Sequence, residues 1–463
     1  MNLFVYWVLA EGESGISITD TALNKGMTSV RAVVIGGSIA GLLSARVLAD
    51  YFEQVIVIDK DKLPQTPQPR RGGVPQSVQP HVLFTKGYRI LGDFFPGIES
   101  KLDANGALNI DWAREFKHYF GGEWGLTTEH PSDIVSVTCS RYLLEWTIRQ
   151  ELLKLPQIDF LEQSKVAELV VNAKAEHIKG VCLHSGKQLD AELVVDASGR
   201  SSQASGWLKQ IGCTAAPEMV VNPFLGYATR RYKIPDDLDL DWKVLLISQT
   251  PPQDNRLGYL AKIEGNELIA TLGGYGKDFP PLDDDGFLEF AQSLAQPDFY
   301  QAIALCTPSS PIYAHRATAN RLRNYEQIKL PGGFVTLGDA VCALCPVYGQ
   351  GMTVSALAAE ILQSWLDKSA DKPLDNNLFQ KQLAKSNSLS WMLATSQDSR
   401  FPTTVGGKNN SGLFDGLIAG YTNKLISKSV SEPRLHLLFL EVAHLLRSPL
   451  TLYHPKVIWQ VLT

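Results

Sequence analysis

The residues best suited to chemistry form a glycine-rich turn, V-V-I-G-G-S-I-A-G-L over Val33–Leu42. Gly36 allows a tight turn, and Gly41 lets a helix pack closely on the strand before it. The free N–H groups of such a turn and the positive end of the helix suit a pyrophosphate. Asp59 stands where a carboxylate can accept hydrogen bonds from ribose hydroxyls. The pattern predicts a dinucleotide site, although Ser38 replaces the middle glycine of G-x-G-x-x-G and glycine-rich turns also occur in other α/β proteins.

A second cluster lies far along the chain, as L-G-D-A over Leu337–Ala340 and P-V-Y-G-Q-G-M over Pro346–Met352. A carboxylate such as that of Asp339, at the end of a buried strand, can hold a ribityl hydroxyl. Glycines at a helix start let backbone N–H groups reach the edge of a flavin, and the helix end favours negative charge on the reduced ring. Because both motifs occur in one chain, the sequence predicts that the dinucleotide is FAD.

These clusters need strands and helices to position them. The β-branched run Val30–Ile35 predicts a buried parallel strand, Ile39–Phe52 a helix and Gln54–Asp59 a second buried strand. Together they form a β-α-β unit, for which a right-handed crossover is expected. The second cluster lies between a predicted strand at Phe334–Leu337 and a predicted helix at Thr353–Leu366.

The rest of the chain predicts further elements of both kinds. Helices are expected at Val82–Phe95 and Arg141–Lys154, and strand and turn over Trp112–Thr128. A small antiparallel meander that leads back into the main sheet is expected at Ala167–Val171, Ile178–Leu183 and Gln188–Val195. Strands of a separate sheet are expected at Gly226–Tyr232, Trp242–Gln249, Arg256–Ile263 and Glu267–Gly274. The stretch Asn376–Thr463 is expected to be mainly helical, interrupted by the polar loop Arg400–Ser411.

We therefore expect an α/β protein with a Rossmann-like FAD-binding domain (a parallel sheet with helices), a mostly antiparallel β-sheet substrate domain and a C-terminal helical region. The expected bounds are 27–110, 135–215 and 310–370 for a discontinuous FAD-binding domain, 111–134 and 216–309 for the substrate domain, and 371–463 for the helical region. Residues 1–26 are expected to be a dispensable extension before a functional start at Met27.

Composition and charge limit the kinds of partner and cellular compartment that we expect. The formal net charge is −5, from 43 basic and 48 acidic residues, which gives no electrostatic footprint for nucleic acid or an anionic membrane. No apolar run reaches transmembrane length. The cysteines are dispersed, and Cys342 and Cys345 lack a second C-x-x-C, which favours buried thiols in a reducing, cytoplasmic setting. Peripheral membrane contact by helices such as Leu435–Leu446 is less favoured than packing on the FAD domain, and both a monomer and a homodimer stay open.

From Met27 onward the chain resembles the single-component FAD-dependent monooxygenases with the aromatic-hydroxylase fold, particularly the bacterial branch that includes polyketide epoxidases and relatives of squalene monooxygenase. The matching stretches are the glycine turn with Asp59, R-R-G-G-V-P-Q-S-V-Q-P-H at Arg70–His81, S-R-Y-L-L-E around Arg141, G-Y-A-T-R-R-Y-K-I-P at Gly226–Pro235, Gly338-Asp339 and Pro346–Met352. Two departures are D-A-S-G-R at Asp196–Arg200, where relatives carry a D-G motif associated with FAD and NAD(P)H, and Cys345, where asparagine is common.

The resemblance implies the residues of the site. FAD would be bound by Gly36, Gly37, Ser38, Ile39, Ala40, Gly41, Asp59, Lys60, Arg71, Arg141, Asp196, Gly338, Asp339, Pro346, Gly349, Gln350, Gly351 and Met352. Arg71, near the pyrophosphate and flavin, and Tyr348, in the flavin loop, are the candidate catalytic residues. The substrate would meet Tyr227, Trp242, Tyr259 and Tyr348, although core packing of the sheet explains most such aromatic residues equally well.

The resemblance also implies a reaction. NAD(P)H would reduce FAD, and O2 would form a flavin C4a-hydroperoxide that hydroxylates or epoxidises an apolar small molecule of natural-product, polyketide, prenyl or aromatic type. One alternative is an FAD-dependent reductase or dehydrogenase of a prenyl or polyketide substrate. Another is a flavin halogenase, which the absence of a W-x-W-x-I-P signature disfavours. A non-enzymatic redox sensor is the remaining alternative.

Overall fold

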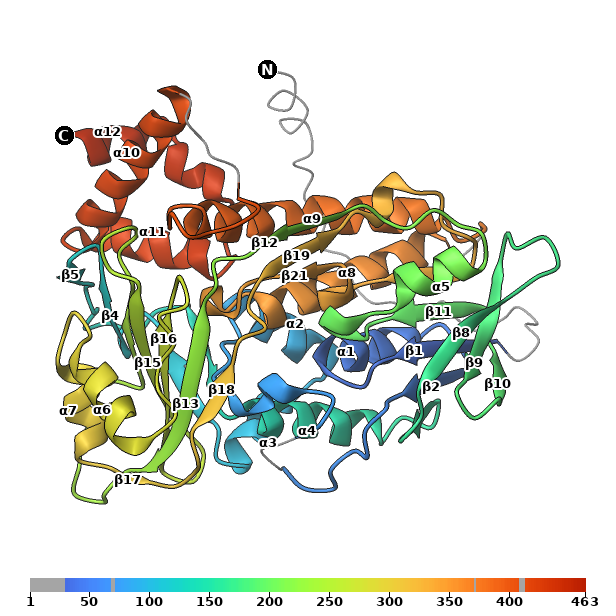
Figure 1. Cartoon of the computed structure of the whole chain (residues 1–463), viewed down its shortest axis with the longest axis horizontal. Helices are drawn as coiled ribbons and strands as arrows, with labels where there is room; N and C mark the ends of the chain where they lie inside the picture. Colours follow the sequence, from blue (N-terminus) through green and yellow to red (C-terminus); the bar gives the residue numbers. More distant parts are fainter. Residues whose placement is uncertain (1–29, 68–70, 370–371, 408–412) are drawn as a thin grey trace.

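The structure, a computed structural model, describes residues 30–67, 71–369, 372–407 and 413–463. The expected N-terminal extension, Met27, and Arg70 of the stretch Arg70–His81 lie outside these residues. The described chain forms a parallel sheet with helices, a separate and mostly antiparallel sheet, and a group of C-terminal helices (Figure 1). The expected fold class is therefore confirmed.

The parallel sheet has the strand order β20-β11-β1-β2-β7. Its strands are β1 (Arg31–Ile35), β2 (Gln54–Ile58), β7 (Ile158–Leu161), β11 (Leu193–Asp196) and β20 (Phe334–Thr336). In the middle of the sheet, Val33 of β1 lies opposite Val194 of β11 and Ile56 of β2. Val33 and Val194 are fully buried, which explains why these strands are continuous apolar runs.

The predicted β-α-β unit is present, with α1 (Ile39–Leu48) between β1 and β2. The helix ends at Leu48, before the predicted Phe52, because the chain turns there to re-enter the sheet. The N–H groups of Asp50 and Tyr51 donate to the carbonyls of Val47 and Leu48, at 3.1 and 3.0 Å. Helix α8 (Gly351–Lys368) packs beside α1, and begins two residues earlier than predicted.

The predicted meander forms β8 (Val166–Val171), β9 (Ile178–Leu183) and β10 (Gln188–Asp190). The expected return to the main sheet is present, and it divides the segment Gln188–Val195 into two strands, β10 and β11. Strand β10 pairs antiparallel with β9, whereas β11 pairs in parallel with β1 and β20. At the junction the N–H of Ala191 donates to Lys179 and that of Glu192 to Arg31.

The second sheet contains the four predicted strands as β13 (Gly226–Lys233), β14 (Val244–Ile247), β15 (Arg256–Ile263) and β16 (Glu267–Gly274), together with β4 (Phe116–Phe120), β5 (Glu123–Trp124), β17 (Thr307–Pro308) and β18 (Tyr313–His315). It is antiparallel except where β14 pairs in parallel with β4. One face packs on α6 (Asp284–Gln292) and α7 (Asp298–Ala304), which the sequence analysis did not predict.

Smaller elements join these layers. Strands β3 (Leu108–Asp111) and β6 (Val135–Thr138) pair, as do β12 (Glu218–Val221), β19 (Asn320–Arg323) and β21 (Cys342–Ala343) in a third sheet. The remaining helices are α2 (Thr85–Phe94), α3 (Ile98–Ala104), α4 (Arg141–Leu152), α5 (Ala204–Gln210), α9 (Asn376–Asp398), α10 (Leu413–Ser429), α11 (Pro433–Ala443) and α12 (Pro455–Leu462). Among the described residues, no helix is both long and apolar enough to cross a membrane.

Candidate functional site

The glycine turn joins β1 to α1 and is built on very close backbone contacts. Gly36 has a φ of +106°, and a Cβ there would lie 2.6 Å from the carbonyl oxygen of Ala197. A Cβ on Gly41 would lie 1.7 Å from the carbonyl oxygen of Gly36. Both positions therefore require glycine, and the turn leaves the N-terminus of α1 open to a ligand.

Asp59 holds this turn from the end of β2. Its Oδ2 accepts the N–H of Gly37 at 2.8 Å and Nη2 of Arg71 at 2.6 Å, and its Oδ1 accepts the N–H of Asp61 at 2.8 Å. Arg71 also donates to the carbonyl of Gly37 at 3.1 Å. The structure thus brings Asp59 and Arg71 to the glycine turn, as the sequence analysis expected.

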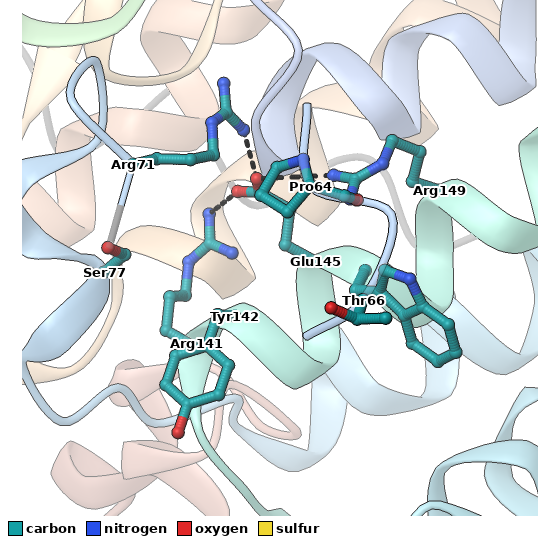
Figure 2. Close-up of a pocket in the computed structure, with 9 residues that line it drawn as sticks. Pro64, Thr66, Arg71, Ser77, Arg141, Tyr142, Glu145 and Arg149 are labelled. Carbon is teal, nitrogen blue, oxygen red and sulfur yellow. Dashed lines mark hydrogen bonds and ion pairs between the residues drawn. The ribbon is translucent and has the colours of Figure 1, made fainter. Parts of the chain in front are cut away.

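Glu145 of α4 lies among three arginines beside the same turn (Figure 2). It pairs with Arg71, with Arg141 at 3.0 Å and with Arg149 at 3.8 Å. Its Oε2 also accepts the hydroxyl of Ser38 at 3.0 Å. Burial raises the pKa of Glu145, but the charges of Arg141 and Arg71 outweigh it and lower the pKa below its usual value. The carboxyl is therefore ionised, and the sequence analysis missed it.

Arg141 points at the N-terminus of α1, and one of its guanidinium nitrogens has no hydrogen-bond partner among the described residues. Its side chain is 5% exposed, and its Nη2 donates to the hydroxyl of Ser38 at 2.8 Å. Its Nη1 is buried and has no hydrogen-bond partner among the described residues. A buried donor without a partner is costly, so this guanidinium is suited to an anionic ligand.

The second predicted cluster lies against the first. Strand β20 leads into the short helix η4 (Gly338–Ala340), where Gly338 has a φ of +62° and a Cβ would lie 2.7 Å from the side chain of Ala40 on α1. The adjacent Asp339 is partly exposed and lies 3.7 Å from Nε of Arg200. Two motifs far apart in the sequence thus form one site along the carboxyl edge of the parallel sheet.

The loop Pro346–Met352 continues this edge into α8. It begins with the short helix η5 (Pro346–Tyr348), and Gly349 adopts a left-handed φ of +65°. A Cβ on Gly349 would lie 3.3 Å from Val82 and 3.4 Å from Phe84. The side-chain Oε1 of Gln350 is buried without a partner among the described residues. The loop therefore has a backbone conformation that favours glycine at position 349, and a buried side-chain oxygen on Gln350 that accepts no hydrogen bond from the described residues.

Tyr348 contacts a residue that the sequence analysis did not select, Asp398 at the end of α9. The Tyr348 hydroxyl donates to Oδ1 of Asp398 at 2.5 Å, and the Tyr275 hydroxyl lies 3.3 Å from the same oxygen. Burial raises the pKa of Asp398 to about 6, although the groups that donate to it act to lower the pKa. The contact spans fifty residues of sequence, so no local pattern signals it.

The predicted substrate residues separate. Tyr227 is buried, and its hydroxyl has no partner among the described residues; it packs in a cluster with Cys345, next to Tyr348. Tyr259 lies on the same face of the sheet, because Tyr227 and Leu257 both lie opposite Gly273 and Tyr259 is two residues further along β15. Trp242 instead packs in the cluster beneath α6 and α7.

Two predicted cofactor residues, Lys60 and Asp196, do not contact the glycine turn in the way that Asp59 and Arg71 do. Lys60 is exposed next to Asp59. Asp196 is fully buried, and its carboxylate accepts the N–H of Ser198 at 3.0 Å and the hydroxyl of Ser202 at 2.5 Å. Asp196 therefore holds the turn after β11 internally, which is a supporting position at the site.

Comparison with known proteins gives one relative by sequence and several by structure. No family model matches the sequence. The structure is similar to PqsL, a probable FAD-dependent monooxygenase from Pseudomonas aeruginosa, with a TM-score of 0.59 and 16% identity over 80% of this chain and 94% of that one. It is also similar to the myxobacterial chondrochloren halogenase CndH, with a TM-score of 0.61 and 13% identity over 90% of this chain and 97% of that one.

The Diels–Alderase PyrE3 of pyrroindomycin biosynthesis has a similar structure too, with a TM-score of 0.59 and 14% identity over 90% of this chain and 80% of that one. At these identities the likeness shows a shared fold. Protein Rv3254 of Mycobacterium tuberculosis (strain ATCC 25618 / H37Rv) is 31% identical over 385 residues, and the match covers 80% of this chain and 80% of that one. The protein therefore belongs to the same family as Protein Rv3254.

Proposed function

We propose that this protein is an FAD-dependent monooxygenase that hydroxylates or epoxidises an apolar small molecule, with NAD(P)H as the reductant. One observation carries the proposal: the glycine turn and the Gly338–Met352 segment meet at the contact between Gly338 and Ala40, beside the unpartnered guanidinium nitrogen of Arg141. The fold supports it, since FAD-dependent monooxygenases and halogenases have the same architecture.

The residues present fit FAD. Gly36 and Gly41 let the backbone form the close turn before α1, and Arg141 has a buried donor nitrogen without a partner among the described residues. Further along the edge, the hydroxyl of Ser198 and the side-chain oxygen of Gln350 are buried without partners among the described residues. Unsatisfied polar atoms of this kind are rare in folded proteins, and a polar ligand that follows the edge would satisfy them.

Each part of the site would have its own task. Arg71, Arg141 and the N-terminus of α1 would hold the pyrophosphate, Asp59 the ribose, Asp339 the ribityl chain, and the backbone of Gly349–Met352 the flavin ring. Bound FAD supplies electron transfer and oxygen activation, and the protein supplies binding, orientation and exclusion of water.

The environment of Tyr227 and Tyr348 supports an apolar substrate. Around them lie Leu225, Leu257 and Cys345, which form one buried cluster with Tyr227. Mostly apolar walls with a few hydroxyl groups are typical of sites for small organic molecules. Tyr227 would orient the substrate through its unused hydroxyl, and the apolar side chains would keep water out.

The fold does not separate monooxygenation from related outcomes, because a halogenase and a Diels–Alderase have it as well. Oxygen and NAD(P)H consumption therefore decide the reaction. A monooxygenase consumes one O2 and one NAD(P)H for each oxygenated product. A reductase needs no O2, and a halogenase requires chloride or bromide.

The first experiment is FAD binding by the purified full-length protein, measured by quenching of flavin fluorescence. We expect Arg141→Gln to weaken binding at least about tenfold, since one charge-assisted hydrogen bond to phosphate contributes at least that factor. Arg46→Gln is the control, because Arg46 pairs with Asp50 on the surface of α1. If wild-type protein binds no FAD, or if both variants bind like wild type, the proposal is wrong.

A further inference from the structure

The carboxyl of Asp398 is the centre of a buried network behind the loop Pro346–Met352. Asp398 is fully buried at the end of α9, and three groups donate to it. The hydroxyls of Tyr348 and Tyr275 reach Oδ1 at 2.5 and 3.3 Å, and Nδ2 of Asn320 reaches Oδ2 at 2.5 Å. Both carboxylate oxygens are therefore used as acceptors.

Asn320 extends this network to the other end of the turn. Its Oδ1 accepts the backbone N–H of Cys345 at 2.7 Å, while its Nδ2 donates to Asp398. Asp398 thus holds the turn at Tyr348 directly and at Cys345 through Asn320. Between these two points lies η5, which leads into the glycines at the start of α8.

The segment after Asp398 is itself held by residues that directly follow β16 and β12. Phe401 stacks on Tyr275 with ring centroids 4.1 Å apart, and the hydroxyl of Thr404 donates to the carbonyl of Asp398 at 2.5 Å. Val405 and Asn222 exchange backbone hydrogen bonds of 2.8 and 3.0 Å. These contacts hold the segment that follows Asp398, so the C-terminal region supports the loop from behind.

We propose that Asp398 is a positioning residue: its ionised carboxylate clamps the turn Cys345–Tyr348 and so holds the backbone N–H groups of Gly349–Met352 in place for the flavin. This inference rests on the proposed function. It adds a residue from the C-terminal helical region to a site whose other parts come from the parallel-sheet region, and it assigns Tyr348 a structural link to Asp398.

The chemistry of the clamp requires a carboxylate. A carboxylate presents two charged acceptor oxygens, whereas an amide presents one acceptor and one donor. In Asp398→Asn, either the tyrosine hydroxyls or Asn320 therefore loses its acceptor, whichever way the amide is turned. Protonation of Asp398 has a related effect, because it removes the charge that strengthens these bonds.

The pH at which this occurs is within reach of experiment. Burial raises the pKa of Asp398 to about 6, so the clamp should weaken as the pH falls below that value. The titratable groups that face the carboxyl are Tyr348, Tyr275 and Tyr227, and burial raises the pKa of each, so they stay neutral. Cys345 is likewise neutral, because burial raises its pKa.

The histidines near the site do not titrate in the same range. Burial lowers the pKa of His81 to about 3 and that of His315 to about 4. Burial also raises the pKa of Asp339 in the FAD site, so a change near pH 6 is assigned to Asp398 only if Asp398→Asn removes it.

Hydrogen exchange tests the clamp in protein without added FAD. The exchange of backbone amides in the peptide covering residues 341–352 would be followed by mass spectrometry at pH 7.5. We expect Asp398→Asn and Tyr348→Phe to exchange faster than wild type there. Asp375→Asn, at the N-cap of the same helix, and Tyr325→Phe, at another buried tyrosine, are matched controls that should leave this peptide unchanged.

FAD affinity measured against pH provides the second readout. We expect wild-type affinity to fall about tenfold between pH 7.5 and pH 5, the change for one charge-assisted hydrogen bond. Asp398→Asn should already be weak at pH 7.5 and show no such step, which a merely structural defect would not produce. If wild type binds no FAD, the proposed function fails while the exchange result still decides the clamp. If wild type binds FAD and Asp398→Asn matches it in exchange and in pH profile, the clamp is wrong.

Discussion

Gly41 provides a direct test of how the glycine turn is built. A methyl group on its Cα would lie 1.7 Å from the carbonyl oxygen of Gly36 and 2.9 Å from the carbonyl carbon. Because both atoms belong to the backbone, neither can rotate away, and α1 would have to move off the turn by more than an ångström. Overpacking a buried contact typically costs about 1–3 kcal/mol. The upper end applies, since α1 carries Leu42 and Leu43 into the main core.

Helix propensity acts in the opposite direction and sets the net effect. Alanine is favoured over glycine in a helix by about 1 kcal/mol. We therefore expect Gly41→Ala to lower the free energy of unfolding by about 2 kcal/mol. Gly206 in α5 is the matched control, because it is exposed and nothing lies within 4 Å of an added Cβ. There the same substitution should raise the free energy of unfolding, by up to about 1 kcal/mol.

Urea unfolding of wild type, Gly41→Ala and Gly206→Ala, followed by circular dichroism, measures both effects. The two variants should shift the midpoint in opposite directions. FAD titration of the same samples should show weaker binding by Gly41→Ala alone, because the N-terminus of α1 moves. A Gly41→Ala protein as stable as Gly206→Ala would refute the close approach of α1 to the turn.

Two further substitutions test the charge cluster and the second sheet. Glu145→Gln should lower the free energy of unfolding by about 3 kcal/mol at pH 7, because Arg141 loses its buried ionised partner. The pKa of Glu145 is lowered in the folded protein, so the stability difference between wild type and Glu145→Gln is complete above the unfolded carboxyl pKa of about 4.3. The difference becomes smaller as the pH falls below that value. Equal stability differences at pH 7 and pH 4 would contradict the prediction. Trp242→Ala should lower the free energy of unfolding by about 3–5 kcal/mol without changing FAD affinity. A loss of substrate affinity with no loss of stability would instead show that Trp242 belongs to the substrate site.

The local patterns of the sequence predicted the parts of the fold that local physics determines. The apolar runs of β1 and β2, the helix between them and the position of Asp59 all follow from residues within one β-α-β unit. The second motif could also be predicted, because a strand, glycines and a helix start occur in order around Gly338. The sequence analysis assigned both motifs to one FAD site because of their chemistry. In the structure the two motifs meet where Gly338 contacts Ala40.

Strand ends, the helices that cover a sheet, and contacts between distant side chains depend on which segments pack together. A local sequence pattern says little about such packing. The pattern over Gln188–Val195 predicts the return to the main sheet, but not the residue at which one strand ends and the next begins. Helices α6 and α7 were missed within a region of alternating strands, although Asp283 caps α6 and Phe287 and Phe290 have helical spacing. Asp398 could not be selected, because its partners lie on three other segments of the chain.

Ser38 shows why the departure from the usual fingerprint fits this site. A glycine in the middle position would let the backbone approach a phosphate, but it would carry no side chain to link the neighbouring charges. Here the Ser38 hydroxyl accepts from Arg141 and donates to Glu145, and it does not cap α1. The backbone N–H groups at the start of α1 are therefore left for a ligand, while the hydroxyl fixes the guanidinium beside them. In the proposed FAD complex, Ser38 would thus direct the Arg141 cation at the phosphate, where the usual fingerprint has a glycine.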